Sequence, residues 1–561
     1  MPPLPTPVTS IPTSAATDSH PNLAPGPTQT DPAPARRFSF LRPSHQHSAS
    51  SATILLGGFA LLSRVVGLIR DKYIAYTFGA GPSTDAYNVA FQLPDLITSL
   101  LIGGAASISF VTILTRYREA GQDEEGDRAL SVILTTISLV LGLALGLTEF
   151  AVPLYTRYFC PSDPVAVALC TSMTRILLPG QIFFFFGGVL ASVALVRKQF
   201  TYQALAPLVY TSGILLGGVL LKNYIGIRSL AWGAFFGAFA GPVLVNGYAA
   251  RRAGARIRPM WDLGNPGLRE WVRMSLPLMF GFTVVFMDQY ILTYFAKHYT
   301  GDISRILAAK RLFGAPIAVL GQAAGAASMP FFASLFSRNL FADYASAVNR
   351  SVTRLLSVSL LAAAAMLGLA QPIVNVLLRG GHYQPQDAHA TAIYFAIFTL
   401  SLPFWAAQSL YARAFFAAGE TRLPMIGGTA VMLLSLPVYW QLHRTFGMAG
   451  LAWASDIAIA AQTVTLAVLA HRRRLVPLFG LDRPEIARGL AAALLSYGTI
   501  LLLLRLLPHL GGWGGWGGLG GWWGSLALLA AGGTAWALIA AISLKLLGSH
   551  SLDQILRRRT A

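Results

Sequence analysis

Long apolar runs recur along the whole 561-residue chain. A helix rises about 1.5 Å per residue, so about 20 apolar residues are needed to cross a hydrocarbon core about 30 Å thick. Only 12% of the residues are charged and the mean hydropathy is +0.56, whereas soluble domains carry about 25% charged residues. The chain is therefore predicted to be an all-α polytopic membrane protein. About fourteen spans are expected, at 53–72, 86–115, 129–155, 166–196, 203–221, 229–250, 270–296, 306–336, 353–378, 390–419, 424–442, 447–470, 486–507 and 523–546.

The N-terminal segment, residues 1–50, is rich in Pro, Ser and Thr and has no apolar run. Such a composition cannot bury enough apolar surface to offset the entropy of ordering, so a disordered tail is predicted. The first apolar run begins near Ala52 and exceeds the length of a signal peptide. No cleavage is expected there.

The basic residues predict the orientation of the spans. If the N-terminus is cytoplasmic, the inside segments hold 27 Lys and Arg and the outside segments hold 9. This bias follows the positive-inside rule and predicts that both termini are cytoplasmic. The net charge of +19 is explained by topology, and no nucleic-acid partner is expected.

Two short patterns return about 220 residues later in the chain, as expected of a transporter with internal repeats. Gly104-Ala-Ala-Ser in the second span recurs as Gly325-Ala-Ala-Ser in the eighth, and Leu178-Pro179 recurs as Leu402-Pro403. The pattern predicts two six-helix lobes around a central cavity and two further helices. The corresponding boundaries are 51–258 for the N-lobe, 259–470 for the C-lobe and 471–561 for the last two helices with a basic tail.

Several arginines lie inside or at the ends of these spans, where lipid alone would not tolerate them. Arg64 and Arg70 fall in the first span and Arg311 in the eighth. Guanidinium groups hold phosphate bidentately, which suits a cavity for an anionic head group. Arg64 shares a helix face with Asp71, whereas Arg70 is expected to point about 100° away from it. The alternative for each arginine is a structural ion pair or a side chain that reaches the interface.

Two intramembrane acids, Asp288 and Asp456, could bind Na⁺ or relay protons, or they could be hydrogen-bonded packing residues. Cys160 and Cys170 could pair outside the cytoplasm, but two free or buried thiols are the favoured interpretation. The chain has no HExxH, GxSxG, P-loop or CxxC motif. We therefore expect a protein that is not an enzyme and holds no cofactor.

Three stretches resemble a known family. Ser63 to Leu96 looks like the opening of the MurJ-type (MviN) lipid II flippases of the multidrug/oligosaccharidyl-lipid/polysaccharide exporter superfamily. The segment 308–335 resembles the eighth helix of that family, and 411–424 resembles the loop after its tenth helix. The resemblance implies fourteen helices in two lobes around a cavity that alternates between the two sides of the membrane.

The resemblance also implies functional residues. By position, Ser63, Arg64, Arg70, Asp71 and Asp85 match the first-helix motif of the family, and Arg311 matches its eighth-helix arginine. The family's proposed sodium site draws on helices seven, eleven and twelve; Asp288 and Asp456 are present, but the eleventh span has no Asp or Asn. This chain has Thr98, Ser99 and Gly103-Gly104-Ala105 where the family typically has an arginine and a Glu-Gly-Ala.

The expected function is the flipping of lipid II, an undecaprenyl-diphosphate-linked disaccharide-pentapeptide, across a bacterial inner membrane. The partners implied are this lipid, membrane lipids and proteins of cell-wall synthesis, with the protein itself a monomer. A Na⁺ or H⁺ gradient or the membrane potential would bias the cycle. Because of these differences from the family pattern, a second candidate function stays open, the export of another lipid-linked oligosaccharide. A third candidate is a drug/cation antiporter.

Overall fold

The computed structural model describes residues 49–549, except 103–104, 162, 197–200 and 511–520. The described residues form helices joined by turns and loops, with one isolated β-bridge between Gly380 and Tyr383, which confirms the predicted all-α class. Nearly all of the predicted 1–50 tail, and most of the Gly/Trp-rich stretch 511–524, lie outside the described residues.

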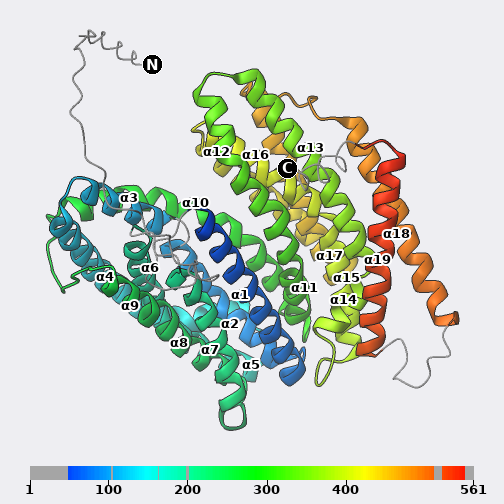
Figure 1. The fold of residues 1–561 in the computed structure, drawn as a ribbon. Helices are drawn as coiled ribbons and strands as arrows, with labels where there is room; N and C mark the ends of the chain where they lie inside the picture. Colours follow the sequence, from blue (N-terminus) through cyan, green and yellow to red (C-terminus); the bar gives the residue numbers. More distant parts are fainter. Residues whose placement is uncertain (1–48, 103–104, 162, 197–200, 511–520, 550–561) are drawn as a thin grey trace, which may run out of the picture.

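One group of helices comes from the first half of the chain (Figure 1). A π-helical stretch, Phe239–Val245, joins α8 to α9 and contains Pro242, which has no N–H to donate. The helices are α1 (Ala49–Phe78), α2 (Pro82–Ile102), α3 (Ala105–Glu119), α4 (Asp123–Phe159), α5 (Pro164–Leu177), α6 (Gly180–Val196), α7 (Thr201–Ile225), α8 (Arg228–Ala238) and α9 (Asn246–Arg252).

A second group lies beside the first, and α10 contacts both, packing against α2, α3 and α4 on one side and α11 and α17 on the other (Figure 1). The predicted domain boundaries stay predictions. The remaining helices are α10 (Pro266–Ala296), α11 (Asp302–Pro316), α12 (Ala323–Ser337), α13 (Phe341–Gly368), α14 (Ala370–Leu377), α15 (Pro385–Leu400), α16 (Leu402–Ala417), α17 (Arg422–Arg472), α18 (Arg483–Leu510) and α19 (Trp522–Leu546).

Every predicted span overlaps a helix or a pair of consecutive helices. The eleventh and twelfth spans form one helical segment, α17, with a kink at Gly447, whose φ of 58° suits glycine. Within the described residues, eight helical segments are long and apolar enough to cross a membrane when α5 and α6, and likewise α8 and α9, are each taken together; there are nine if α15 and α16, bent by 44°, also count as one. The number fourteen therefore stays a prediction.

One helix break falls at corresponding places in the two halves, as the repeat predicts. The eighth span is divided into α11 and α12, which are joined by a π-helical stretch, Ile317–Gln322, whereas residues 103–104, between α2 and α3 in the second span, lie outside the described residues. The fourth span breaks between α5 and α6, at Leu178-Pro179, and the tenth between α15 and α16, next to Leu402-Pro403. Proline removes a helix hydrogen bond, which explains the last two breaks.

Glycines let α7 and α8 approach closely. Gly213 and Gly217 on α7 face Gly233 and Gly237 on α8, and a Cβ on Gly217 would lie 2.4 Å from the Gly233 Cα. Small residues at four-residue spacing allow this kind of backbone contact between membrane helices.

The segment between α9 and α10 is fixed along α4 by three hydrogen bonds. The backbone N–H groups of Arg256, Arg258 and Met260 donate to side chains of Asp127 (2.9 Å), Ser131 (3.2 Å) and Thr135 (3.2 Å). Four helical residues rise about 6 Å and two extended residues about 6.6 Å, so the spacing of the acceptors on α4 matches the spacing of the donors on the extended segment.

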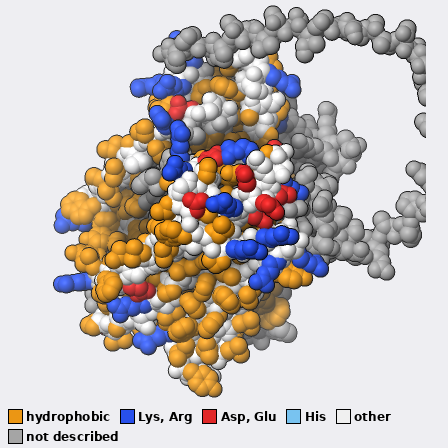
Figure 2. Space-filling model, turned by 90° about the vertical axis from the view of Figure 1, so that its left-hand side faces the viewer, with side chains coloured by type: hydrophobic (Ala, Val, Ile, Leu, Met, Phe, Trp, Pro, Cys, Tyr) orange, Lys and Arg blue, Asp and Glu red, His pale blue; other side chains and the backbone are white. Residues whose placement is uncertain are grey.

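Charged side chains gather toward the upper part of this side of the molecule, above a broad hydrophobic surface (Figure 2).

The interpretation of Cys160 and Cys170 as free thiols was wrong, because they form a disulfide. Cys160 follows the last residue of α4, and Cys170 lies in α5, so the bridge ties together two consecutive helices. The chain reverses direction between these helices, which brings two cysteines only ten positions apart into reach.

Candidate functional site

Arg70, Asp71 and Arg311 come together between α1 and α11. Both Nε (3.1 Å) and Nη2 (2.9 Å) of Arg70 donate to one oxygen of Asp71. Nη1 of Arg311 lies 3.5 Å from the same oxygen. Arg70 starts from another face of α1, as expected, but its long side chain reaches back to its neighbour. Two cations from different helix groups therefore share one carboxylate.

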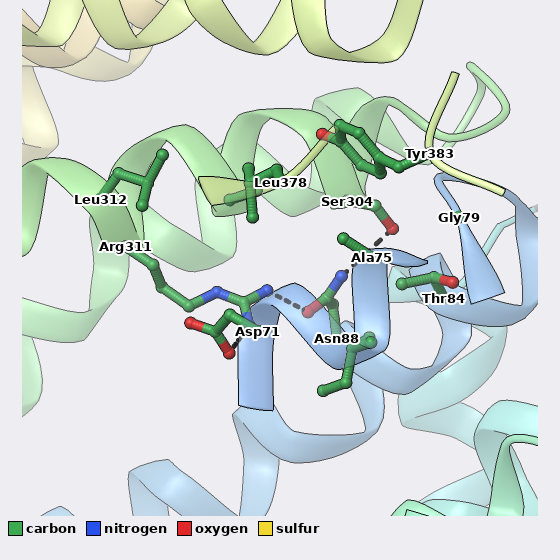
Figure 3. A pocket seen from close by; sticks show the side chains of 12 residues that line it. Asp71, Ala75, Gly79, Thr84, Asn88, Ser304, Arg311, Leu312, Leu378 and Tyr383 are labelled. Atoms are coloured by element: carbon green, nitrogen blue, oxygen red, sulfur yellow. Dashed lines mark hydrogen bonds and ion pairs between the residues drawn. The ribbon is translucent and has the colours of Figure 1, made fainter. Parts of the chain in front are cut away.

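Arg311 also contacts α2. Its Nη2 donates to the amide oxygen of Asn88 (2.5 Å), and the Asn88 amide nitrogen donates to Ser304 (3.2 Å) (Figure 3). A small pocket beside these residues is also lined by Thr84 and Tyr383. The side chain of Arg311 is 38% exposed, so its guanidinium is accessible to a ligand.

Asp85, whose role in binding substrate stays a prediction, caps the start of α11. Its side chain is fully buried and accepts hydrogen bonds from the backbone N–H groups of Gly301 (2.6 Å) and Ser304 (2.7 Å). Ser304 Oγ donates a third bond (2.5 Å). An N-cap side chain normally accepts from the third residue of its own helix. Here the N-cap residue is Gly301, and the first helix group supplies the carboxylate.

Further contacts join the two groups at this same end, where α1 ends. Lys72 Nζ donates to the carbonyl oxygen of Arg379, and the His382 N–H donates to the carbonyl oxygen of Tyr76 (2.9 Å). Gln92 donates to Thr293 (2.5 Å). The two groups thus close on each other through α2, α10, α11 and the segment after α14.

Ser63 and Arg64 lie on α1, two turns before this closure. The Arg64 side chain is exposed, and that of Ser63 is half-buried. Within the described residues, Arg64 has no ion pair. Its role in binding substrate stays a prediction.

Asp95 was not among the predicted site residues. It follows Pro94 in α2 and is exposed, yet it interacts electrostatically with Arg70 and Arg311. An acid next to a helix-breaking proline was the available signal, since freed backbone groups must face protein or a cavity.

The candidate cation residues Asp288 and Asp456 form a second polar cluster with Lys310. The Lys310 ammonium is ion-paired with Asp288, which also accepts a hydrogen bond from the Tyr439 hydroxyl. Asp456 interacts electrostatically with Lys310. Arg175 and Glu149 form a separate ion pair at 3.7 Å.

Comparison with solved structures defines the class. The fold matches "Lipid II flippase MurJ, inward closed conformation" with a TM-score of 0.71 at 21% identity, covering 88% of this chain and 99% of that one. It also matches an inward-facing multidrug resistance MATE family transporter of the MOP superfamily, with a TM-score of 0.63 at 15% identity, covering 75% and 98%. The chain therefore shares the fold of these two multi-span transporters.

The chain belongs to the lipid II flippase MurJ family, because the model of that family matches residues 74–513. This match includes Asp85, Asp288, Arg311 and Asp456 but begins after Asp71. A probable lipid II flippase MurJ of Rhizobium meliloti is 28% identical over 78% of this chain and 85% of its own length. The lipid II flippase MurJ of Burkholderia cenocepacia is 26% identical over 75% and 84%.

Proposed function

We propose that this protein flips lipid II from the cytoplasmic to the outer leaflet of a bacterial inner membrane. Family membership supports the substrate. The observation that carries the site is the convergence of Arg70 and Arg311 on Asp71. A diphosphate offers several anionic oxygens in place of this single carboxylate, and bidentate guanidinium contacts suit it.

Alternating access follows from the two groups of helices. With a cytoplasmic N-terminus, the closed end around Asp85 faces outward, so the substrate enters from the cytoplasmic side. Its diphosphate displaces Asp71 and links Arg70 on α1 to Arg311 on α11. The return step is biased by the membrane potential, which is worth about 2.3 kcal/mol per charge per 100 mV.

We further propose that the protein works as a monomer with both termini in the cytoplasm, near the proteins of cell-wall synthesis. The excess of basic residues in the predicted inside segments supports this orientation. An inner-membrane location agrees with the apolar helices of the described residues.

Complementation tests this function. Bacteria depleted of their own lipid II flippase would express the wild type or Arg64→Ala, Arg70→Ala or Arg311→Ala, and surface-exposed lipid II would be measured. We expect rescue by the wild type and loss of rescue by the variants at equal membrane levels. Arg444→Ala is the control, because Arg444 stacks on Trp440 (4.1 Å) outside the site. Rescue by both Arg64→Ala and Arg311→Ala would disprove the site.

A second candidate, export of another lipid-linked oligosaccharide, is favoured by one contact. Thr98, which stands where the family typically has an arginine, donates to the side-chain oxygen of Gln181. This part of α2 therefore carries a hydroxyl in place of a cation, and the hydroxyl is bound to a buried amide of α6. Absence of rescue by a well-expressed wild type would favour this candidate.

A further inference from the structure

The ammonium of Lys310 lies where four helices meet. Lys310 is on α11, its partner Asp288 is on α10, and Asp456 is on α17. The ring of Phe398 on α15 lies 5.8 Å from the ammonium nitrogen. The side chain is 25% exposed, but its nitrogen is shielded from solvent. A charge in such a place is costly unless it is paired.

Both oxygens of Asp288 are already engaged. The Tyr439 hydroxyl donates to Oδ1, the Ser455 hydroxyl donates to Oδ2 (3.2 Å), and the ammonium contacts Oδ2. The carboxylate thus has two hydroxyl donors and a cation around it. Three of the about four lone-pair sites of this carboxylate are therefore occupied, one of them by a cation.

Asp456 is the second carboxylate of the cluster. It is 7% exposed, and its two oxygens have no hydrogen-bond partner within the described residues. Its electrostatic partner is Lys310, with Ser401 the neighbouring hydroxyl. The Ser401 hydroxyl donates to the carbonyl oxygen of Phe398 (2.6 Å). One ammonium therefore interacts with two carboxylates, of which Asp456 is buried and Asp288 is half-buried.

These residues do not fit a sodium site of the kind the family resemblance implies. Hard cations need several oxygen ligands at once. Here the ammonium of Lys310 is bound to the carboxylate of Asp288, and the hydroxyl groups of Tyr439 and Ser455 donate hydrogen bonds to that same carboxylate. The first half of α17, residues 424–442, contributes Tyr439 but has no Asp or Asn.

We propose that Lys310 is the resident counter-cation of Asp288 and Asp456 and takes the place of an exchangeable Na⁺. The consequence of this inference is that transport needs no Na⁺, and only this consequence rests on the proposed flippase function. Lys310 is then the residue that determines ion dependence, and its removal leaves two carboxylates with no cation between them. Such a pair attracts a small monovalent cation from solution.

Binding of Na⁺ tests the proposal without any transport assay. Thermal unfolding of the purified full-length protein would be followed while NaCl replaces choline chloride at constant ionic strength. We expect no saturable shift in the wild type. Lys310→Met and Lys310→Gln should each gain a saturable rise in Tm of a few degrees, which Asp456→Asn added to either should abolish. Lys297→Met is the matched control, because Lys297 donates to the Tyr158 carbonyl oxygen (2.7 Å) outside the cluster.

A saturable Na⁺-dependent shift in the wild type overturns the proposal, and so does a folded Lys310→Met or Lys310→Gln without one. If neither variant folds, the wild-type measurement decides alone. Lipid II flipping by the wild type in proteoliposomes should be equal with and without Na⁺. A wild type that flips no lipid II in either medium disproves the proposed function and leaves the binding result standing.

Discussion

At the scale of single residues, Asp71 has two opposed effects. Its carboxylate offsets one of the two positive charges of Arg70 and Arg311, which lowers the cost of holding two guanidinium groups inside the bundle. The same carboxylate competes with any anionic ligand for these groups. If the proposed site binds a diphosphate, its affinity is the attraction of the two guanidinium groups to the ligand minus their attraction to Asp71.

Asp71→Asn is expected to bind a diphosphate more tightly, because the competing charge is gone. We expect the Kd for farnesyl diphosphate to fall about tenfold, which corresponds to about 1.4 kcal/mol, while flipping slows. Calorimetric titration of the purified protein measures the affinity. Asp343→Asn, which changes an exposed acid at the start of α13, serves as the control. Unchanged or weaker binding by Asp71→Asn would show that Asp71 does not compete.

Helical spacing placed Arg64, Arg70 and Asp71 on α1, but it could not show their partners. Arg311 is 240 residues away from Asp71 in the chain, and only the packing of α11 against α2 brings it near. The same applies to Lys310, whose partners lie on α10 and α17. Helical periodicity shows on which face of its helix a residue lies, whereas the tertiary packing determines which residues contact that face.

At the scale of elements, the contact between α7 and α8 depends on the absence of side chains. Gly217→Leu is expected to destabilise the protein by at least about 1–3 kcal/mol, the usual range for overpacking, because backbone atoms of α8 cannot move aside. Gly142→Leu on α4 is the matched control, since nothing lies within 4 Å of its added Cβ. Thermal unfolding in detergent compares the two, and equal Tm values would contradict the packing.

The helices themselves were largely predictable, because length and hydropathy define an apolar span. Their breaks were predictable where a proline marks them, as at Pro179 and Pro403. The anchoring of the α9–α10 segment along α4 was not, because Asp127, Ser131 and Thr135 are polar residues at ordinary helical spacing. Their function depends on an extended segment more than 100 residues later in the chain.

At the scale of the whole molecule, the two helix groups are joined at one end by side chains that must separate during transport. Asn88 and Ser304 are hydrogen-bonded at 3.2 Å, so a thiol cross-linker can join them in the double variant Asn88→Cys, Ser304→Cys. The cross-link should slow flipping at least about tenfold, because alternating access requires the two helix groups to part. Flipping in proteoliposomes before and after cross-linking measures the effect. Each single-cysteine variant treated with the same reagent is the control, and undiminished flipping in the cross-linked protein would disprove movement at this end.

From the sequence, the class of the whole molecule was predictable, because it depends on hydropathy, and the repeat was inferred from motif spacing. The sequence also predicted a substrate-binding role for the arginines from their charge, and that role stays a prediction. The sequence could not predict which end of the molecule is closed. That depends on contacts such as Lys72 with Arg379 and Tyr76 with His382, between segments with no complementary sequence pattern.

Because Asp85 caps α11 from the other helix group, the joining of the two groups at this end is coupled to the folding of the first turn of α11. When the two groups part, the first turn of α11 loses the acceptor of its Gly301 and Ser304 N–H groups, and an uncapped helix end frays. Closing again then means re-forming that turn. Helix formation takes about 0.1–1 μs, whereas movements of whole domains take μs to ms. The cap can therefore deepen the closed state of the carrier without becoming the slow step of its cycle.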